Sequence, residues 1–403
     1  MPRGARVIAG GALVALTPIV SHSFGRSTFG LLLPAIEDTL QLSHSRTGLG
    51  GTTIYAAYLV GVLVVASLAS RVEPISIMRG GVAVGAVGLL FLSTVHGLGG
   101  LIIGLALTGS AGAGIWVTAP AILTASVGPK RRGLVIGMLT ASTGLGSFVV
   151  GNITNLARDR SGKEDLWRPI WFFEDLVALL LLAGLLFVVR AVRTERVSAG
   201  GFNLSRLRAV PQWRRVTAAY ALFAAVGAGF SPFIVRALQS DAGLSRSHAT
   251  RLWALMGLVA IPGAPTMGYL SDRFGRKPLM MLVLGVAAGG TATVALSRGG
   301  LATAGVLCYG AVWSSFPTLT ATYVRDHVEA RAFNEAFSTM TIFYSIAALS
   351  APFLTGSLAD RTGHFRTPFL VLACLCGGGF MLLIRLHENR PTYRSEDLAN
   401  TLV

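Results

Sequence analysis

The feature that most constrains this chain is a series of apolar segments, each about twenty residues long, that continues along most of its 403 residues. That length is what an α-helix needs to cross the hydrocarbon core of a bilayer. Inside lipid every backbone amide must find its partner within the protein, so such segments fold as helices. The sequence predicts an all-α membrane protein with twelve transmembrane helices, near residues 7–34, 48–70, 76–95, 99–124, 133–156, 169–190, 216–238, 252–270, 278–297, 301–324, 333–356 and 367–386.

The charged residues are few and unevenly distributed. They make up 13% of the chain, whereas a soluble domain carries about a quarter. The net charge of +16 would suggest a nucleic-acid partner in a soluble protein. Here most Lys and Arg residues fall in one alternate set of loops, which is the positive-inside pattern of a membrane protein. We therefore expect membrane lipids and no nucleic acid as partners, with both termini in the cytoplasm.

The excess of arginine over lysine suggests what kind of organism the chain comes from. The chain has 31 Arg and 3 Lys, which is typical of a GC-rich bacterial genome. Together with the twelve segments, this predicts a multi-pass protein of the bacterial inner membrane.

A polar, arginine-rich stretch interrupts the apolar rhythm near the middle of the chain. It predicts an N-terminal six-helix bundle over residues 1–190, a cytoplasmic linker over 191–215, and a C-terminal six-helix bundle over 216–403 with a short tail. The two bundles are related by an internal repeat, because Trp116 and Pro120 in the fourth segment match Trp313 and Pro317 in the tenth. Paired repeats of this kind are a transporter architecture.

Motifs for other chemistry are missing from the sequence. It contains no phosphate-binding loop, no His-Glu-x-x-His and no Cys-x-x-Cys pair, so we expect no enzyme activity, no cofactor and no metal.

One loop carries a family signature. The segment Gly268-Tyr-Leu-Ser-Asp-Arg-Phe-Gly-Arg-Lys277 resembles the loop motif of the major facilitator superfamily, at the matching place after the second helix of a half. The resemblance covers essentially the whole chain and implies two pseudo-symmetric six-helix bundles, with helices one, four, seven and ten around a central cavity. The string from Phe24 to Pro34 is similar to the first helix of the YbfB/YjiJ-like carriers of that superfamily.

The same resemblance implies a conformational latch made of Asp272, Arg273, Gly275, Arg276 and Lys277. In members of the family the carboxylate lies against the start of the eleventh helix, here near 332–335, where the helix dipole favours a negative charge. The first half departs from the pattern, since Ser70 stands in place of the acidic residue. Asp360 lies at the outer end of the eleventh helix, where a gate contact is a further hypothesis.

Arg26 is the most informative single residue, because an arginine deep in a transmembrane segment costs about 2.5–3.5 kcal/mol and needs a cavity or a partner. It is an anion clamp, or one member of an ion pair with Glu174 or Asp175, or a side chain that snorkels toward the outer surface. His22, Glu174 and Asp175 are candidates for proton coupling, against the alternative of ordinary structural hydrogen bonds.

Aromatic residues form the second group of candidates. Trp116 and Trp313 lie away from the membrane interfaces, so they can contact an apolar or flat part of a substrate, or simply pack the bundle. Tyr55, Tyr58 and Tyr309 are weaker candidates of the same kind.

These features predict a secondary active transporter that acts as a monomer and moves a small organic solute by alternating access. An organic anion is favoured by Arg26, and protons are a candidate coupling ion. The alternatives are proton-coupled efflux of amphipathic drugs, favoured by the two Trp residues, and a membrane sensor that does not transport.

Overall fold

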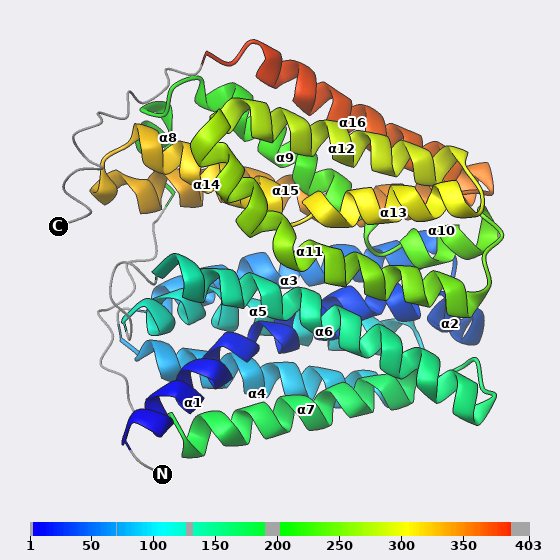
Figure 1. The fold of residues 1–403 in the computed structure, drawn as a ribbon. Helices are drawn as coiled ribbons and strands as arrows, with labels where there is room; N and C mark the ends of the chain where they lie inside the picture. The colour runs from blue at the N-terminus through cyan, green and yellow to red at the C-terminus, as the bar shows by residue number, and fades with distance from the viewer. Residues whose placement is uncertain (1–2, 70, 126–131, 190–201, 388–403) are drawn as a thin grey trace.

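The computed structural model describes residues 3–69, 71–125, 132–189 and 202–387, which form helices and no strands. Figure 1 shows them as two bundles, one above the other, with the chain ends and α8 at the same end of the molecule. The first bundle contains α1 (Arg3–Leu16), η1 (Ile19–Ser27), α2 (Thr28–Leu40), α3 (His44–Leu68), α4 (Pro74–Leu92), α5 (Leu98–Ala125), α6 (Arg132–Ser161) and α7 (Trp167–Phe187). The second contains α8 (Leu204–Arg208), α9 (Trp213–Phe230), α10 (Ile234–Ser240), α11 (Arg246–Phe274), α12 (Arg276–Leu296), α13 (Gly300–Val312), α14 (Ser315–His327), α15 (Ala330–Thr362) and α16 (Arg366–Ile384). We call the end with α8 the linker end and the other the opposite end.

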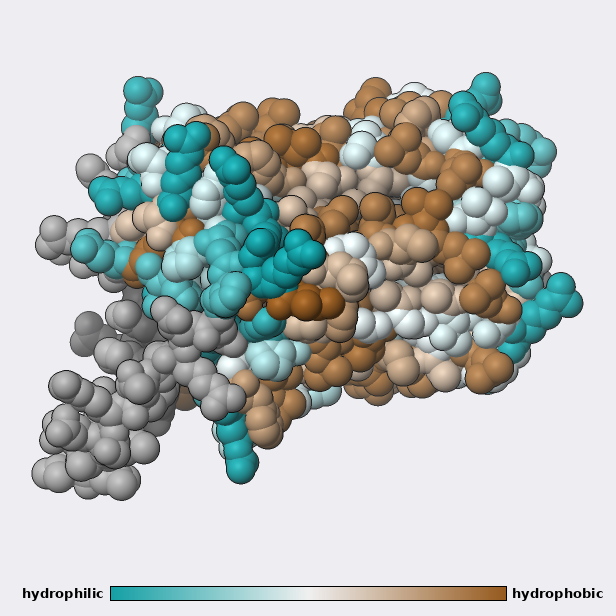
Figure 2. Space-filling model, turned by 90° about the horizontal axis from the view of Figure 1, so that it is seen from above, coloured by the Kyte–Doolittle hydropathy of each residue, from teal (hydrophilic) through white to brown (hydrophobic). Residues whose placement is uncertain are grey.

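The molecule has the surface of a membrane protein. Within the described residues, nine helices are long and apolar enough to cross a bilayer, or ten with the bent pair α9–α10 counted as one span. Helix α6 and the pair α13–α14 run alongside them, which is consistent with the predicted twelve. Figure 2 shows a band of apolar side chains between two polar ends. Large apolar side chains on this band are exposed, because they face lipid. Phe187, for example, has 83% of its surface exposed.

Three of the predicted helices are interrupted. The first is broken at Phe24 and Gly25, where φ at Gly25 is +64°, a conformation that side chains other than glycine rarely adopt. The seventh bends by 54° between α9 and α10, next to Pro232, which has no N–H to continue the helix. The tenth divides into α13 and α14 around Trp313. Interrupted helices in membrane proteins are tolerated where they line a cavity or are buried in protein.

The two bundles touch along α3 with α15, α6 with α11, and α2 with α10. Glycine allows the backbones to approach closely at these crossings. A Cβ atom at Gly48 would lie 2.5 Å from the Pro352 carbonyl oxygen, and one at Gly144 would lie 2.6 Å from the Gly257 carbonyl oxygen. The bundles therefore meet through backbone contacts that larger side chains would prevent.

The predicted linker is partly described. Residues 190–201 lie outside the described part, as does Ser70, so the weakened latch predicted for the first half stays a prediction. The described chain resumes at residue 202, just before α8, whose first turn is capped by the Asn203 side chain. The Asn203 amide also donates to Glu335 Oε2, at 2.7 Å, which ties α8 to α15.

Candidate functional site

A cavity of about 260 Å³ lies between the two bundles. It is lined by His22, Arg26 and Ser27 of η1, Tyr55 and Tyr58 of α3, Trp116 of α5, Thr140, Thr143 and Gly144 of α6, Tyr220 of α9, Ala260 of α11, Trp313 and Ser314 between α13 and α14, Pro317 and Thr318 of α14, and Thr341, Tyr344 and Ser345 of α15. The break in the first helix and the division of the tenth both face this space. Concave sites between helices of a bundle are where membrane transporters bind small solutes.

Among the described residues that line the cavity, Arg26 is the one with a permanent charge. Its guanidinium carbon lies 4.4 Å from the centre of the Tyr55 ring, a cation–π distance. Within the described residues it forms no ion pair with a carboxylate, so the predicted alternative of a pair with Glu174 or Asp175 does not occur in this conformation. The guanidinium therefore keeps hydrogen-bond donors available to a ligand.

Five more predicted residues line the same cavity. His22 stacks against Trp116, with 4.6 Å between ring centres, and its Nδ1 lies 2.9 Å from the Ser21 hydroxyl. Tyr58 meets His22 edge-on, at 6.3 Å between ring centres. Tyr55 and Trp313 complete the group.

Sequence reasoning missed part of the lining. Tyr220 and Tyr344, whose ring centres are 4.5 Å apart, face the cavity from the second bundle. Thr140, Thr143 and Ser314 were also missed. Tyr220 could have been found, because it lies on the seventh helix, which the resemblance already assigned to the cavity.

Three predicted residues lie elsewhere. Tyr309 is fully buried against Phe230, with 4.5 Å between ring centres, because α13 turns that face into its own bundle. Glu174 is fully buried behind the break in the first helix, where Oε2 accepts the Gly25 N–H at 3.3 Å. Asp175 is buried beside it on α7. Neither carboxyl group is among the cavity residues.

The predicted latch residues form a cluster at the linker end of the second bundle. Arg276 binds the Asp272 carboxylate one turn away and the Asp326 carboxylate at the end of α14, with Nε 2.8 Å from Asp326 Oδ2. Lys277 donates to the Ile384 carbonyl oxygen of α16, at 2.7 Å. These contacts join the ends of four helices within one bundle.

In this conformation the Asp272 carboxylate is bound to Arg276, and Glu335 near the start of α15 is bound to α8. The family resemblance implies a contact of Asp272 with 332–335 only while the cytoplasmic side is closed, so that contact stays a prediction. Gly275 has φ +99° between α11 and α12, so this sharp turn requires glycine. The Arg273 guanidinium lies 5.6 Å from the centre of the neighbouring Phe274 ring and takes no part in the cluster.

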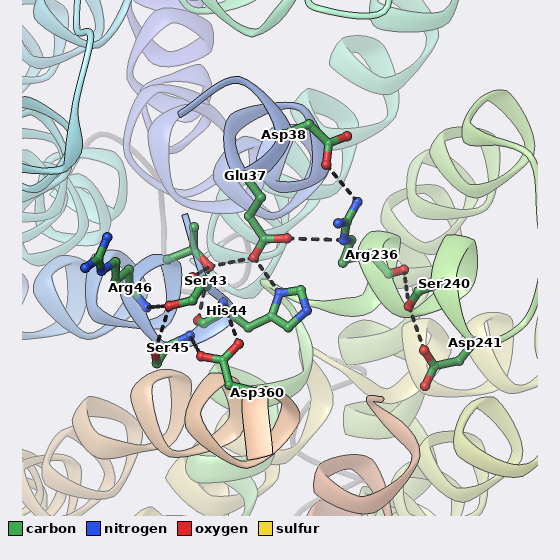
Figure 3. A network of polar contacts seen from close by, with 11 residues as sticks. Glu37, Asp38, Ser43, His44, Ser45, Arg46, Arg236, Ser240, Asp241 and Asp360 are labelled. Carbon is green, nitrogen blue, oxygen red and sulfur yellow. Dashed lines mark hydrogen bonds and ion pairs between the residues drawn. The ribbon is translucent and has the colours of Figure 1, made fainter. Parts of the chain in front are cut away.

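At the opposite end, ion pairs cross from one bundle to the other. Arg236 of α10 binds Glu37 and Asp38 of α2, each at 3.2 Å (Figure 3). Arg246 of α11 also binds Asp38, at 2.7 Å. His44 Nδ1 lies 2.8 Å from Glu37 Oε1. Sequence reasoning did not identify these residues, because acidic and basic side chains just beyond a membrane-spanning segment are usually exposed to water.

Asp360 adds a further crossing contact, in agreement with the hypothesis of a gate contact there. Its two carboxylate oxygens accept the backbone N–H groups of His44 and Ser45, at 2.9 and 2.8 Å (Figure 3). These are the first two amides of α3, which have no partner within the helix. A residue of the second bundle thus caps a helix of the first.

Most of the chain matches a family model, and it also matches curated relatives. The model of the Major Facilitator Superfamily matches residues 19–333 and 216–401. Monocarboxylate transporter 11 of Mus musculus is 27% identical over 393 residues, which are 93% of this chain and 86% of the mouse protein. The Homo sapiens protein of the same name is 26% identical over 391 residues, covering 93% and 81% of the two chains.

Solved structures agree in fold. A bacterial homologue of the human lysosomal transporter Spinster, inward-facing and occupied, has a TM-score of 0.74 at 17% identity, with 95% of this chain and 96% of that chain covered. The nucleoside transporter NupG has a TM-score of 0.75 at 13% identity, with 95% and 100% covered. The xylose transporter XylE of E. coli, partially occluded and inward open, has a TM-score of 0.73 at 14% identity with the same coverage.

Proposed function

Because the chain belongs to the major facilitator superfamily, we propose that it is a secondary active transporter that moves a small organic anion across the bacterial inner membrane. The proteins it matches are transporters and not enzymes. The single observation that supports an anion is Arg26, which lines the central cavity with no acidic residue among the described residues of its wall.

Placing the charge of Arg26 within the membrane has a free-energy cost. An arginine at this depth costs about 2.5–3.5 kcal/mol on insertion scales, and a Tyr ring recovers only about 0.5–2 kcal/mol of it. A carboxylate that forms two parallel hydrogen bonds to the guanidinium would offset the rest. Monocarboxylate transporter 11 carries a substrate of this class in its name, which agrees with the proposal.

The orientation follows from the charge pattern. The basic loops assign the linker end and both chain ends to the cytoplasm. The ion pairs of Arg236 and the contacts of Asp360 then join the bundles at the outer side, so the proposed conformation is the inward-facing one. Alternating access requires that these contacts break as the bundles rock around the cavity. The protein is proposed to act as a monomer, with a bundle boundary in the linker 191–215.

Protons are the proposed coupling ion, and His22 is the titratable group best placed to carry them. It lines the cavity four residues before Arg26, on the other side of the break in the first helix, whereas Glu174 and Asp175 do not line it. An imposed pH gradient should accelerate uptake of the anion into proteoliposomes, and loss of this acceleration in His22→Gln would support the assignment.

Counterflow in proteoliposomes tests the proposed function. A panel of carboxylates should give counterflow with wild type, and Arg26→Ala should reduce the rate at least about tenfold, because a hydrogen bond to a charged group contributes about 1.5–3 kcal/mol. Arg26→Lys should recover little, since an ammonium group cannot form the paired bonds. Arg168→Ala is the matched control, because that arginine binds the Val95 carbonyl oxygen away from the cavity. Equal counterflow in wild type and Arg26→Ala would refute the anion clamp.

Efflux of amphipathic drugs is the second candidate, and the position of Trp116 and Trp313 in the cavity wall favours it. Cationic drugs that bind equally well with and without Arg26 would support it over the anion. A protein that binds a ligand but gives no counterflow would be a sensor.

A further inference from the structure

The cavity wall has an unusual composition for this chain. Six of its residues are Tyr or Trp, although aromatic residues make up 8% of the sequence. Leu, Ile, Val, Met and Phe are the usual residues of an adaptable apolar pocket, and none of them is among the described residues that line it. The flat surfaces available to a ligand are therefore aromatic rings.

The described wall carries one cationic donor and no anionic group. The hydroxyl groups of Thr143, Thr341 and Ser345 already donate to backbone carbonyl oxygens of their own helices, at 2.7, 2.8 and 2.9 Å, so toward a ligand they offer only neutral acceptor oxygens. Donors come from the Arg26 guanidinium, the tyrosine hydroxyls and the indole N–H groups. No Asp, Glu, Asn or Gln is among the described lining residues. Such a wall can bind a negatively charged acceptor, but it offers no carboxylate to an ammonium group.

The aromatic rings are held in place before any ligand arrives. The Trp116 ring packs against His22 with the ring planes inclined by 34°, and the Tyr220 ring packs against Tyr344 with the planes inclined by 40°, so each of these rings is held by contact with another ring of the wall. Trp116 belongs to the first bundle, whereas Trp313 belongs to the second. A flat ligand in the cavity would contact aromatic surface from both bundles, and preorganised rings lose little entropy on binding.

We propose that the substrate is an aromatic monocarboxylate, with its carboxylate on Arg26 and its ring against the Trp116 and Trp313 walls. The inference deepens the proposed function and rests on it. One guanidinium matches one carboxylate, and a cavity of about 260 Å³ holds a single ring with a short side chain. The absence of acidic residues from the described wall disfavours amino acids, and the rings disfavour small aliphatic acids.

Five probes of similar size separate these features. Benzoate has the ring and one charge, cyclohexanecarboxylate has the charge without the flat ring, and benzamide has the ring without the charge. Phthalate adds a second charge, and phenylalanine adds an ammonium group. Each probe is titrated against purified full-length protein by thermal unfolding, where a bound ligand stabilises by mass action, and is then used to compete for counterflow of labelled benzoate.

We expect benzoate to bind about two- to tenfold more tightly than cyclohexanecarboxylate. That factor corresponds to the extra affinity that a contact between two aromatic rings contributes beyond the burial of apolar surface. Benzamide, phthalate and phenylalanine should bind more weakly than benzoate. Trp116→Leu and Trp313→Leu should remove the preference for benzoate, whereas Trp116→Phe and Trp313→Phe keep a ring and should retain most of it. Arg26→Ala should weaken both carboxylates by the same factor.

The possible failures are distinct. If cyclohexanecarboxylate binds as tightly as benzoate and both depend on Arg26, the aromatic assignment is wrong while the anion transporter stands. If benzoate binds equally well to Arg26→Ala, the proposed function itself is wrong. If phenylalanine binds more tightly than benzoate, the argument from the missing carboxylate is overturned.

Discussion

Asp360 provides the sharpest test of how the opposite end closes. Its carboxylate caps α3 of the other bundle through two backbone N–H groups, and this contact exists only while the bundles meet there. Asp360→Ala should therefore weaken the closed form without touching the cavity. Asp241 is a matched control, because it caps α16 through the N–H groups of Phe365 and Arg366, at 2.6 and 3.1 Å, within its own bundle.

The expected magnitude follows from helix capping. Losing a capping side chain costs about 0.5–2 kcal/mol, and Asp360 satisfies two amides while its carboxylate stays largely in water. We take about 1–2 kcal/mol, which changes the ratio of closed to open protein by a factor of roughly 5–30. An open form that is about 1% populated in wild type would then reach about 5–20%.

The assay is a distance measurement between spin labels at positions 46 and 361, where the arginine side chains are exposed on α3 and α15. The labels are placed in a background without Cys308, Cys374 and Cys376. Asp360→Ala should add a longer distance, whereas Asp241→Ala should lower the melting temperature and leave the distances unchanged. Identical distances in wild type and Asp360→Ala, with a normal response to Asp241→Ala, would refute the role of this cap in closure.

Three further predictions concern the interrupted first helix and the bundle contacts. Gly25→Ala should lower the free energy of unfolding by more than about 1 kcal/mol, because φ is +64° and the new Cβ would lie 2.8 Å from Thr108 Cβ. Gly227→Ala is the control and should cost little, because the nearest atom to its new Cβ is 3.5 Å away. Glu174→Gln keeps an acceptor for the backbone N–H at the break and should retain ligand binding, whereas Glu174→Leu should weaken it; equal binding by the two variants would contradict an anchoring role. Gly48→Leu should prevent closure at the opposite end, because the backbone of α15 occupies the required space, and unchanged label distances would contradict this.

Much of the architecture was predictable from local pattern. Twelve apolar segments, the basic loops and the motif from Gly268 to Lys277 led to a two-bundle transporter, and the family match confirms the superfamily. Arg26, Trp116 and Trp313 were identified for a physical reason, since a buried charge and paired indoles away from the interfaces need an explanation. All three line one cavity.

The direction in which one tyrosine side chain points was predicted wrongly. Tyr309 and Tyr220 both lie on helices predicted to surround the cavity, but only Tyr220 faces it, and helical periodicity cannot tell which face of a fully buried helix meets a ligand.

The sequence by itself determined that this chain crosses a membrane, which loops are basic, and that one arginine lies where lipid cannot solvate it, because these properties depend on the composition of each segment. Only the tertiary structure decided that Arg26 has no acidic partner within the described part of the chain, that the cavity wall is aromatic, and that Asp360 caps a helix 316 residues away in the sequence. Such contacts join residues far apart in the chain, so they depend on how the helices pack and not on the pattern within any one of them.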